Sequence, residues 1–178
     1  GVMSGAKQPV RAVRALKVLF VASEMAPLIK TGGLADVAGG LPAALAALGV
    51  DVRVLIPAYH DLASPRKSWK PESRFSPPPG MADCQLHIVP AKVLGVPVWL
   101  LDSPGFSDRP GNPYLDEGGR DWPDNAQRFN RLCRVAARLA AGRAGLSWKP
   151  DLVHANDWQT GLIPVWMLLE RVAQPVLF

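Results

Sequence analysis

A lysine and two glycines follow the first apolar run of the sequence. Lys30 stands just ahead of Gly32 and Gly33, and these glycines open a segment with helical apolar spacing. Glycines between a strand and a helix let backbone N–H groups approach a phosphate, whose charge the helix N-terminus favours. Lys30 would add a full positive charge beside those amides. The residue types are those of a phosphate cradle, and the alternative is a tight turn with Lys30 in solvent.

This segment does not match the common nucleotide fingerprints. Gly32 is followed directly by Gly33 and Leu34, so the GxGxxG pattern of dinucleotide-binding folds is absent. No GK[ST] triplet closes a P-loop either. We therefore expect neither an NAD loop nor an ATP-type loop here.

A second polar group follows a later apolar run that ends at His154. Asp157 comes just past this predicted strand, at the carboxyl end where open α/β sheets place ligands. Its carboxylate could bind hydroxyl groups of a ligand or cap the helix that follows. Tyr114, in a long loop over residues 103–123, could line a cleft or pack on the surface. We expect His154 to be a core histidine rather than a base.

These residues lie on alternating strands and helices. Residues 17–22 and 52–56 are apolar runs typical of strands buried on both faces, and apolar residues recur at helical spacing between them. Strand, helix and strand with tight connections predict a doubly wound, Rossmann-like α/β fold with a parallel sheet. Further strands are predicted over 86–89, 96–101, 151–154 and 175–178, and further helices over 124–142 and 162–172.

The chain divides into a tail and one domain. Residues 1–15 are predicted to form a flexible basic N-terminal tail, and residues 16–178 a single Rossmann-like domain. An apolar strand at 175–178 would lack the partners that follow it, so we expect the domain to be incomplete at its C-terminus.

Composition narrows the class of protein. The 178 residues are 48% hydrophobic and 20% charged, as in a folded globular domain. The two cysteines, Cys84 and Cys133, are far apart, which argues against a disulfide framework or a zinc site and favours the cytoplasm. No apolar run reaches the ~18 residues of a membrane span, so we expect no membrane partner.

The net charge of +5 raises the question of whether the protein binds nucleic acid. Part of this charge lies in the basic tail. The predicted helix over 124–142 also has arginines along one face, and we interpret them as an ordinary solvated face because no aromatic stacking set accompanies them. We expect no nucleic-acid partner. The arginines of this face are Arg128, Arg131, Arg134 and Arg138.

The segment from Ser23 to Val37 resembles the opening of bacterial glycogen synthases and plant starch synthases. Their signature is a lysine, a small residue, two glycines and a leucine, as in residues 30–34. The resemblance continues, in family order, over nearly the whole chain after Leu16. The further blocks are residues 40–42, 57–59, 108–114, 121–129 and 154–162.

The resemblance implies a fold, a reaction and a set of site residues. The family has two Rossmann-like domains facing a cleft, the GT-B arrangement, and transfers glucose from ADP-glucose to the non-reducing end of an α-1,4-glucan with retention. This chain would be most of the N-terminal domain, and its partner would be a missing C-terminal domain. The implied site residues are Lys30, Gly32, Gly33 and Asp36 on the donor, Asp157 as a catalytic residue, and Tyr114 and Asn156 on the acceptor side or cleft.

The implied chemistry needs no metal and no cofactor. No two aspartates are separated by a single residue, so the DxD metal motif of the other main glycosyltransferase architecture is missing. Lys30 and the helix dipole could balance the diphosphate charge instead. Asp36 has a simpler alternative role, as a carboxylate that favours the helix start.

Other functions remain open at this stage. One is another GT-B transferase that uses UDP-glucose, and another is a non-catalytic glucan-binding or nucleotide-binding module. The six tryptophans are scattered rather than arrayed, which argues against a glucan-binding module. The family's next block, with a histidine at the sugar site, would follow Phe178, so we expect this chain alone not to transfer glucose.

Overall fold

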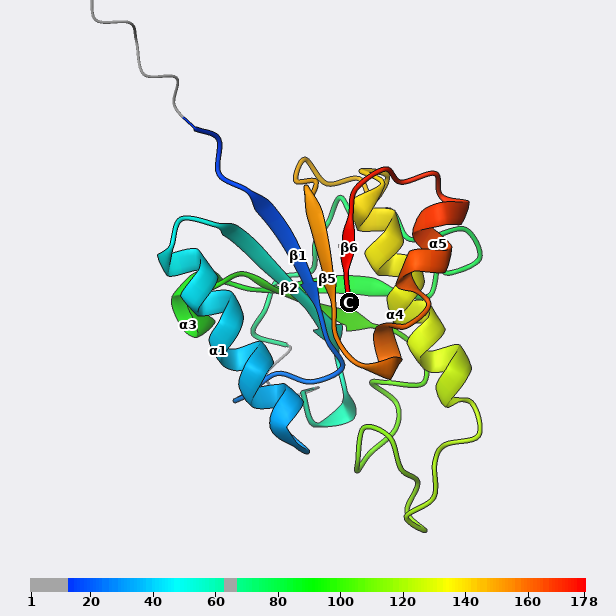
Figure 1. Cartoon of the computed structure of the whole chain (residues 1–178). Coiled ribbons are helices and arrows are strands. Elements are labelled where there is room, and N and C mark those ends of the chain that lie inside the picture. The colour runs from blue at the N-terminus through cyan, green and yellow to red at the C-terminus, as the bar shows by residue number, and fades with distance from the viewer. Residues whose placement is uncertain (1–12, 63–66) are drawn as a thin grey trace, which may run out of the picture.

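The computed structural model describes residues 13–62 and 67–178, and it is built on a six-stranded sheet (Figure 1). The strands lie in the order β3-β4-β2-β1-β5-β6. The predicted doubly wound α/β fold is confirmed. The strands are β1 Lys17–Val21, β2 Asp51–Pro57, β3 Gln85–Val89, β4 Val98–Asp102, β5 Leu152–Ala155 and β6 Val176–Leu177. The helices are α1 Gly33–Ala47, α3 Ala91–Leu94, α4 Asn125–Ala140 and α5 Ile163–Leu169, with 3-10 turns at His60–Leu62 and Trp158–Thr160.

One edge of the sheet departs from the predicted parallel arrangement. β1, β2, β4, β5 and β6 pair in parallel, but β3 runs antiparallel to β4. The connection between these two strands holds only the short helix α3 and a turn at Gly95, whose φ is +83°. A parallel crossover needs about a dozen residues or more, so this short connection must return the chain antiparallel.

Helices cover the sheet on both faces (Figure 1). Leu19 and Val21 of β1 point into a core shared with α4 and α5, while Val18 and Phe20 point into a second core shared with α1. This alternation explains why the strands are continuous apolar runs, because each successive side chain enters one core or the other.

The arginine face of α4 is not the solvated face that we expected. Arg128 is only 3% exposed, and its guanidinium donates to the carbonyl oxygens of Gly105 at 2.6 Å and Pro113 at 2.9 Å. Arg131 and Arg134 also donate to loop residues that precede the helix. These arginines hold the long loop over 103–123 and the segment before β3 against α4, because each guanidinium offers several donors to backbone or side-chain oxygens.

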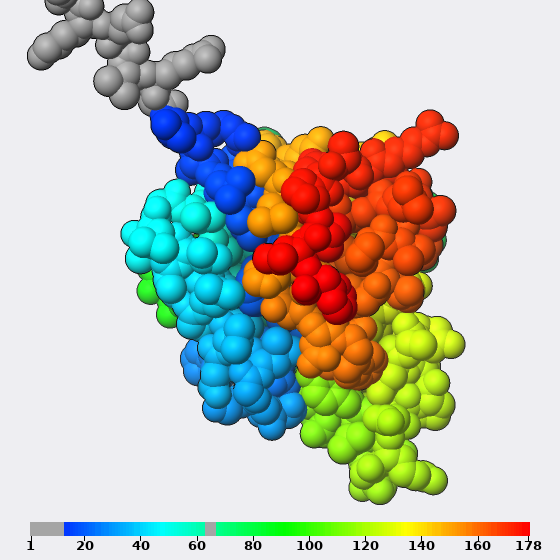
Figure 2. Space-filling model, viewed as in Figure 1, coloured from blue at the N-terminus to red at the C-terminus, as the bar shows by residue number. Residues whose placement is uncertain are grey.

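The C-terminal strand lies at the surface, where Figure 2 shows it in red. Phe178 is 67% exposed, and an apolar hollow of about 300 Å³ lies between α1 and the end of the sheet. His154 lines this hollow with its ring 4.8 Å from that of Phe20, and burial lowers its pKa. His154 is therefore half-buried beside the sheet rather than enclosed in the core as we expected.

Two expectations fall wholly or partly outside the described structure. The predicted tail over residues 1–15 is described only from residue 13, and residues 13–15 are exposed. The prediction of an incomplete domain stays a prediction. In the part of the chain that is described, no helix is both long and apolar enough to span a bilayer.

Two glycines with nearly equal φ give a test of packing. Gly145 has φ +78°, and a Cβ added there would lie 2.1 Å from the carbonyl oxygen of Arg74. Gly80 has φ +77° and no atom within 4 Å of an added Cβ. Both alanine variants carry the left-handed backbone penalty of about 1–2 kcal/mol, and only Gly145→Ala adds a backbone clash. We expect Gly145→Ala to lower the free energy of unfolding by about 1–3 kcal/mol more than Gly80→Ala does, measured by denaturant titration. Equal losses would show that the 74–76 segment does not pack on Gly145.

Candidate functional site

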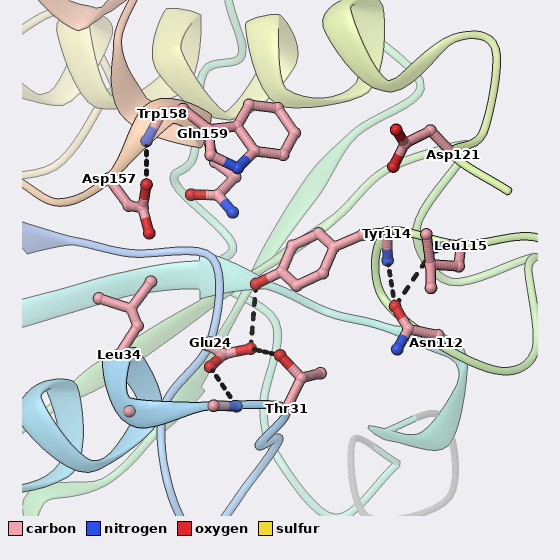
Figure 3. Close-up of a pocket in the computed structure, with 12 residues that line it drawn as sticks. Glu24, Thr31, Leu34, Asn112, Tyr114, Leu115, Asp121, Asp157, Trp158 and Gln159 are labelled. Atoms are coloured by element: carbon pink, nitrogen blue, oxygen red, sulfur yellow. Dashed lines mark hydrogen bonds between the residues drawn. The ribbon is translucent and has the colours of Figure 1, made fainter. Parts of the chain in front are cut away.

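The site lies where the strand order reverses. The chain goes from β1 to β2 on one side and later returns to β5 on the other, so β1 and β5 flank a topological switch point. Open α/β sheets bind ligands at the carboxyl ends of such strands. A pocket of about 430 Å³ opens there (Figure 3). Its lining residues are Glu24, Thr31, Gly32, Gly33, Leu34, Asn112, Tyr114, Leu115, Asp121, Asp157, Trp158 and Gln159.

A buried carboxylate organises one wall of this pocket. Glu24 follows β1 and is 2% exposed. Its Oε1 accepts from the backbone N–H groups of Gly32 at 3.1 Å and Ala35 at 3.3 Å. Its Oε2 accepts from the Thr31 hydroxyl at 2.5 Å and the Tyr114 hydroxyl at 3.0 Å (Figure 3). Glu24 therefore caps the positive end of α1. It also joins the loop that holds Gly32 and Gly33, called the glycine loop below, to the long loop over 103–123.

Tyr114 is fixed from both ends. Its hydroxyl lies 2.8 Å from the Ser23 hydroxyl as well as near Glu24, and its ring centroid is 5.9 Å from that of Phe129. Burial, with a smaller contribution from the Glu24 charge, raises the pKa of the Tyr114 phenol well above its usual value. Tyr114 thus stays protonated and lines the pocket, and surface packing is excluded as its position.

The predicted donor lysine is paired within the chain. Lys30 Nζ lies 2.7 Å and 2.8 Å from the two carboxylate oxygens of Asp36, and both side chains are more than half exposed. Neither of them lines the pocket. An exposed ion pair of this kind is worth at most about 1 kcal/mol, so it leaves Lys30 free to exchange Asp36 for a more strongly charged ligand.

The two glycines keep the start of α1 open. Gly32 precedes the helix with φ −157°, a conformation open to any residue, and Gly33 is its first residue. A Cβ added to either would meet no described atom within 4 Å. Neither backbone geometry nor packing therefore requires glycine here. The Gly32 N–H already binds Glu24, so a phosphate at that amide would compete with a carboxylate.

Asp157 forms the opposite wall in a strained conformation. Its φ of 65° and ψ of 177° lie in a region that is essentially confined to glycine, and such strain is common at functional sites. The Asp157 carbonyl accepts from the Thr160 hydroxyl at 2.9 Å, and Asn156 Nδ2 donates to the Val21 carbonyl at 3.0 Å. These bonds hold the strained residue at the ends of β5 and β1. Asn156 itself is absent from the pocket lining.

The Asp157 carboxylate also has a local role. Its Oδ1 accepts from the Trp158 N–H at 2.7 Å and caps the 3-10 turn Trp158–Thr160 (Figure 3). The residue before α5 is Leu162, so Asp157 does not cap that helix as the alternative interpretation proposed. Capping uses one carboxylate oxygen and leaves the residue on the pocket wall.

Glu24, Trp158 and Gln159 are among the pocket residues that received no role in the sequence analysis. Glu24 stands three residues after the end of β1, and its position beyond a strand's carboxyl end was a usable signal. Trp158 is 55% exposed, with its ring 6.3 Å from that of Tyr114 and 5.3 Å from that of Phe129. Gln159 lies beneath it, and nothing in the local sequence distinguishes this residue from a surface glutamine.

The pocket joins a helix N-terminus to an aromatic and carboxylate wall. The first can bind an anion, and the second can bind hydroxyl groups and the apolar face of a ring. Among residues 13–62 and 67–178, no group of three or more His, Cys, Asp or Glu side chains is placed to hold a metal ion.

Comparison with known proteins decides the family. The model of the starch synthase catalytic domain matches residues 17–176. The chain belongs to the starch synthase catalytic domain family. It is 54% identical over 165 residues to glycogen synthase 1 of Methylococcus capsulatus, an alignment that covers 92% of this chain and 32% of the relative. It is 53% identical over 165 residues to a glycogen synthase of Dechloromonas aromatica, covering 91% of this chain and 33% of the relative.

A solved structure supports the same assignment. The catalytic domain of starch synthase IV from Arabidopsis thaliana, bound to ADP and acarbose, superimposes with a TM-score of 0.67 at 26% identity. The match covers 92% of this chain and 33% of that one. The chain thus spans about a third of the length of the curated relatives it matches.

Replacing the buried carboxylate should loosen both walls. In Glu24→Gln, the charge-assisted hydrogen bonds become neutral ones and one of the two acceptor atoms becomes a donor. We expect the free energy of unfolding to fall by about 1–2 kcal/mol. The matched control is Glu117→Gln on the exposed part of the long loop, with an expected change within about 0.5 kcal/mol. Chemical denaturation measures both, and indistinguishable values would contradict the role given to Glu24.

Proposed function

We propose that the protein containing this domain is a glycogen synthase that transfers glucose from ADP-glucose to the non-reducing end of an α-1,4-glucan, with retention. The chain spans about a third of its relatives' length. The proposal therefore concerns a protein of the relatives' length, with a second GT-B domain facing the pocket.

The observation that carries this proposal is the open start of α1. Gly32 and Gly33 leave open space directly at the positive end of a 15-residue helix, although neither their backbone geometry nor their packing requires glycine there. Such space suits a diphosphate, because its oxygens can approach backbone N–H groups without meeting a side chain. Lys30 would then leave Asp36 and bind the diphosphate as the leaving group gains negative charge.

The opposite wall suits the sugars. Asp157 would hydrogen-bond hydroxyl groups near the reacting carbon, and the exposed Trp158 indole with the Tyr114 ring would contact sugar rings. Asn156 would act indirectly, by holding Asp157 through the β1 carbonyl. We expect no metal ion or cofactor in this reaction.

We also place the reaction in the cytoplasm. Cys84 and Cys133 are both buried and free, and burial raises the pKa of each thiol to about 11. Such protonated thiols are poor nucleophiles and metal ligands, as expected of structural cysteines in a reducing compartment.

Removing the lysine charge tests the donor site. In the full-length protein, we expect Lys30→Ala to lower kcat/KM for ADP-glucose by about 100-fold, which corresponds to the loss of one charged contact to a phosphate. The dissociation constant for maltoheptaose should stay within twofold. The matched control is Lys92→Ala, an exposed lysine of α3, with an expected kcat/KM equal to that of the wild type.

The same assay separates the alternatives. If the wild-type protein elongates maltoheptaose with UDP-glucose but not with ADP-glucose, the proposed sugar donor becomes UDP-glucose. Glucan binding without transfer from either donor would favour a non-catalytic module. Unchanged kcat/KM in Lys30→Ala would contradict the phosphate role of the lysine.

A further inference from the structure

Gln159 is a buried amide on the pocket wall. It lies in the 3-10 turn after β5, is 4% exposed and lines the pocket beside Asp157 and Trp158. Figure 3 shows its amide below the Trp158 indole. Its backbone carbonyl accepts from Cys133 Sγ of α4 at 3.3 Å, which fixes the turn against the helix. This contact fixes the backbone of the turn that carries the side chain.

The amide oxygen of this side chain has no partner. Gln159 Oε1 is fully buried and makes no hydrogen bond to any described residue. Buried polar atoms in native proteins are almost always hydrogen-bonded, and an exception calls for an explanation. Gln159 also lines a second, apolar hollow of about 220 Å³ beneath Trp158, where few polar groups could satisfy it. Of the two hollows, the pocket in front of Asp157 is the more polar, so a hydrogen-bond donor would reach this buried oxygen from that side, after a small shift of the Gln159 side chain.

The residues around the Gln159 amide indicate which kind of hydrogen-bond donor it would bind. The Trp158 indole and the Tyr114 ring offer apolar faces at 6.3 Å centroid separation, and the Asp157 carboxylate lies next in sequence. Sugars combine apolar C–H faces with hydroxyl groups, which donate to amide oxygens. No cationic side chain lines this pocket, so a neutral ligand fits this wall better than a phosphate does.

We propose that Gln159 is a binding residue for the acceptor, with its amide oxygen receiving a hydrogen bond from a hydroxyl of a glucose unit of the glucan. This inference rests on the proposed transferase function and assigns the acceptor to the wall opposite the glycine loop. An amide oxygen without a partner among the described residues also discriminates between ligands, because a ligand without that hydroxyl leaves the oxygen buried and unsatisfied.

The test uses Gln159→Met in the full-length protein. Methionine keeps the length of the side chain and removes the unpaired oxygen. We expect KM for maltoheptaose to rise about tenfold or more, while KM for ADP-glucose stays within twofold and the melting temperature is unchanged or higher. A merely structural glutamine would give the opposite pattern, a lower melting temperature with unchanged KM for the glucan.

Gln174→Met is the matched control. The Gln174 amide donates to the carbonyl oxygens of Ala140 at 3.0 Å and Pro150 at 3.2 Å, so it is a satisfied structural glutamine. We expect this variant to melt at a lower temperature with an unchanged KM for maltoheptaose.

The outcomes separate this inference from the proposed function. Absence of glucose transfer by the wild type would contradict the function, and the dissociation constant for maltoheptaose, measured by calorimetry, would still test Gln159. A dissociation constant for maltoheptaose that is at least tenfold higher in Gln159→Met than in the wild type supports the inference. A KM and a dissociation constant within twofold of the wild type, or a rise confined to ADP-glucose, would overturn it.

Discussion

The Glu24 carboxylate is the interaction on which the rest of the site depends. It is buried, follows β1, and receives hydrogen bonds from the start of α1 and from a tyrosine 90 residues away in the sequence. A buried carboxylate without such donors would be unstable. The glycine loop and the long loop over 103–123 are therefore each necessary for the other's position, and Arg128 fixes the far side of the long loop.

This arrangement places a negative charge at the helix end that would bind a diphosphate. Glu24 already uses the amides of Gly32 and Ala35, so an incoming phosphate meets both an attractive helix dipole and a nearby carboxylate. The Lys30–Asp36 pair at the rim provides a cation that can change partners at low cost. Donor binding would thus depend on a redistribution of existing charges.

Sequence reasoning predicted the scaffold better than the site. The βαβ unit around α1 was predictable because both strands are buried on two faces and apolar residues recur at helical spacing between them. The face that packs was not, because Val37 and Leu41 of that stripe are exposed and α1 buries Ala35, Ala38 and Pro42 instead. The antiparallel direction of β3 could also have been predicted, because the strands expected over 86–89 and 96–101 leave only residues 90–95 between them, too few for a parallel crossover. Arg128 was placed in solvent because periodicity treats arginine as polar, whereas its guanidinium binds buried carbonyls. Gln159 was missed because its environment comes from residues distant in sequence, whereas the position of Glu24 shortly after β1 was a signal that could have been used.

A double-mutant cycle between Glu24 and Tyr114 tests this account most directly. The free energies of unfolding of Glu24→Gln, Tyr114→Phe and the double variant give the coupling between the two loops. The account predicts a coupling energy of about 1 kcal/mol or more, as for residues within one hydrogen-bond network. Additive effects within about 0.5 kcal/mol, as for independent sites, would contradict it.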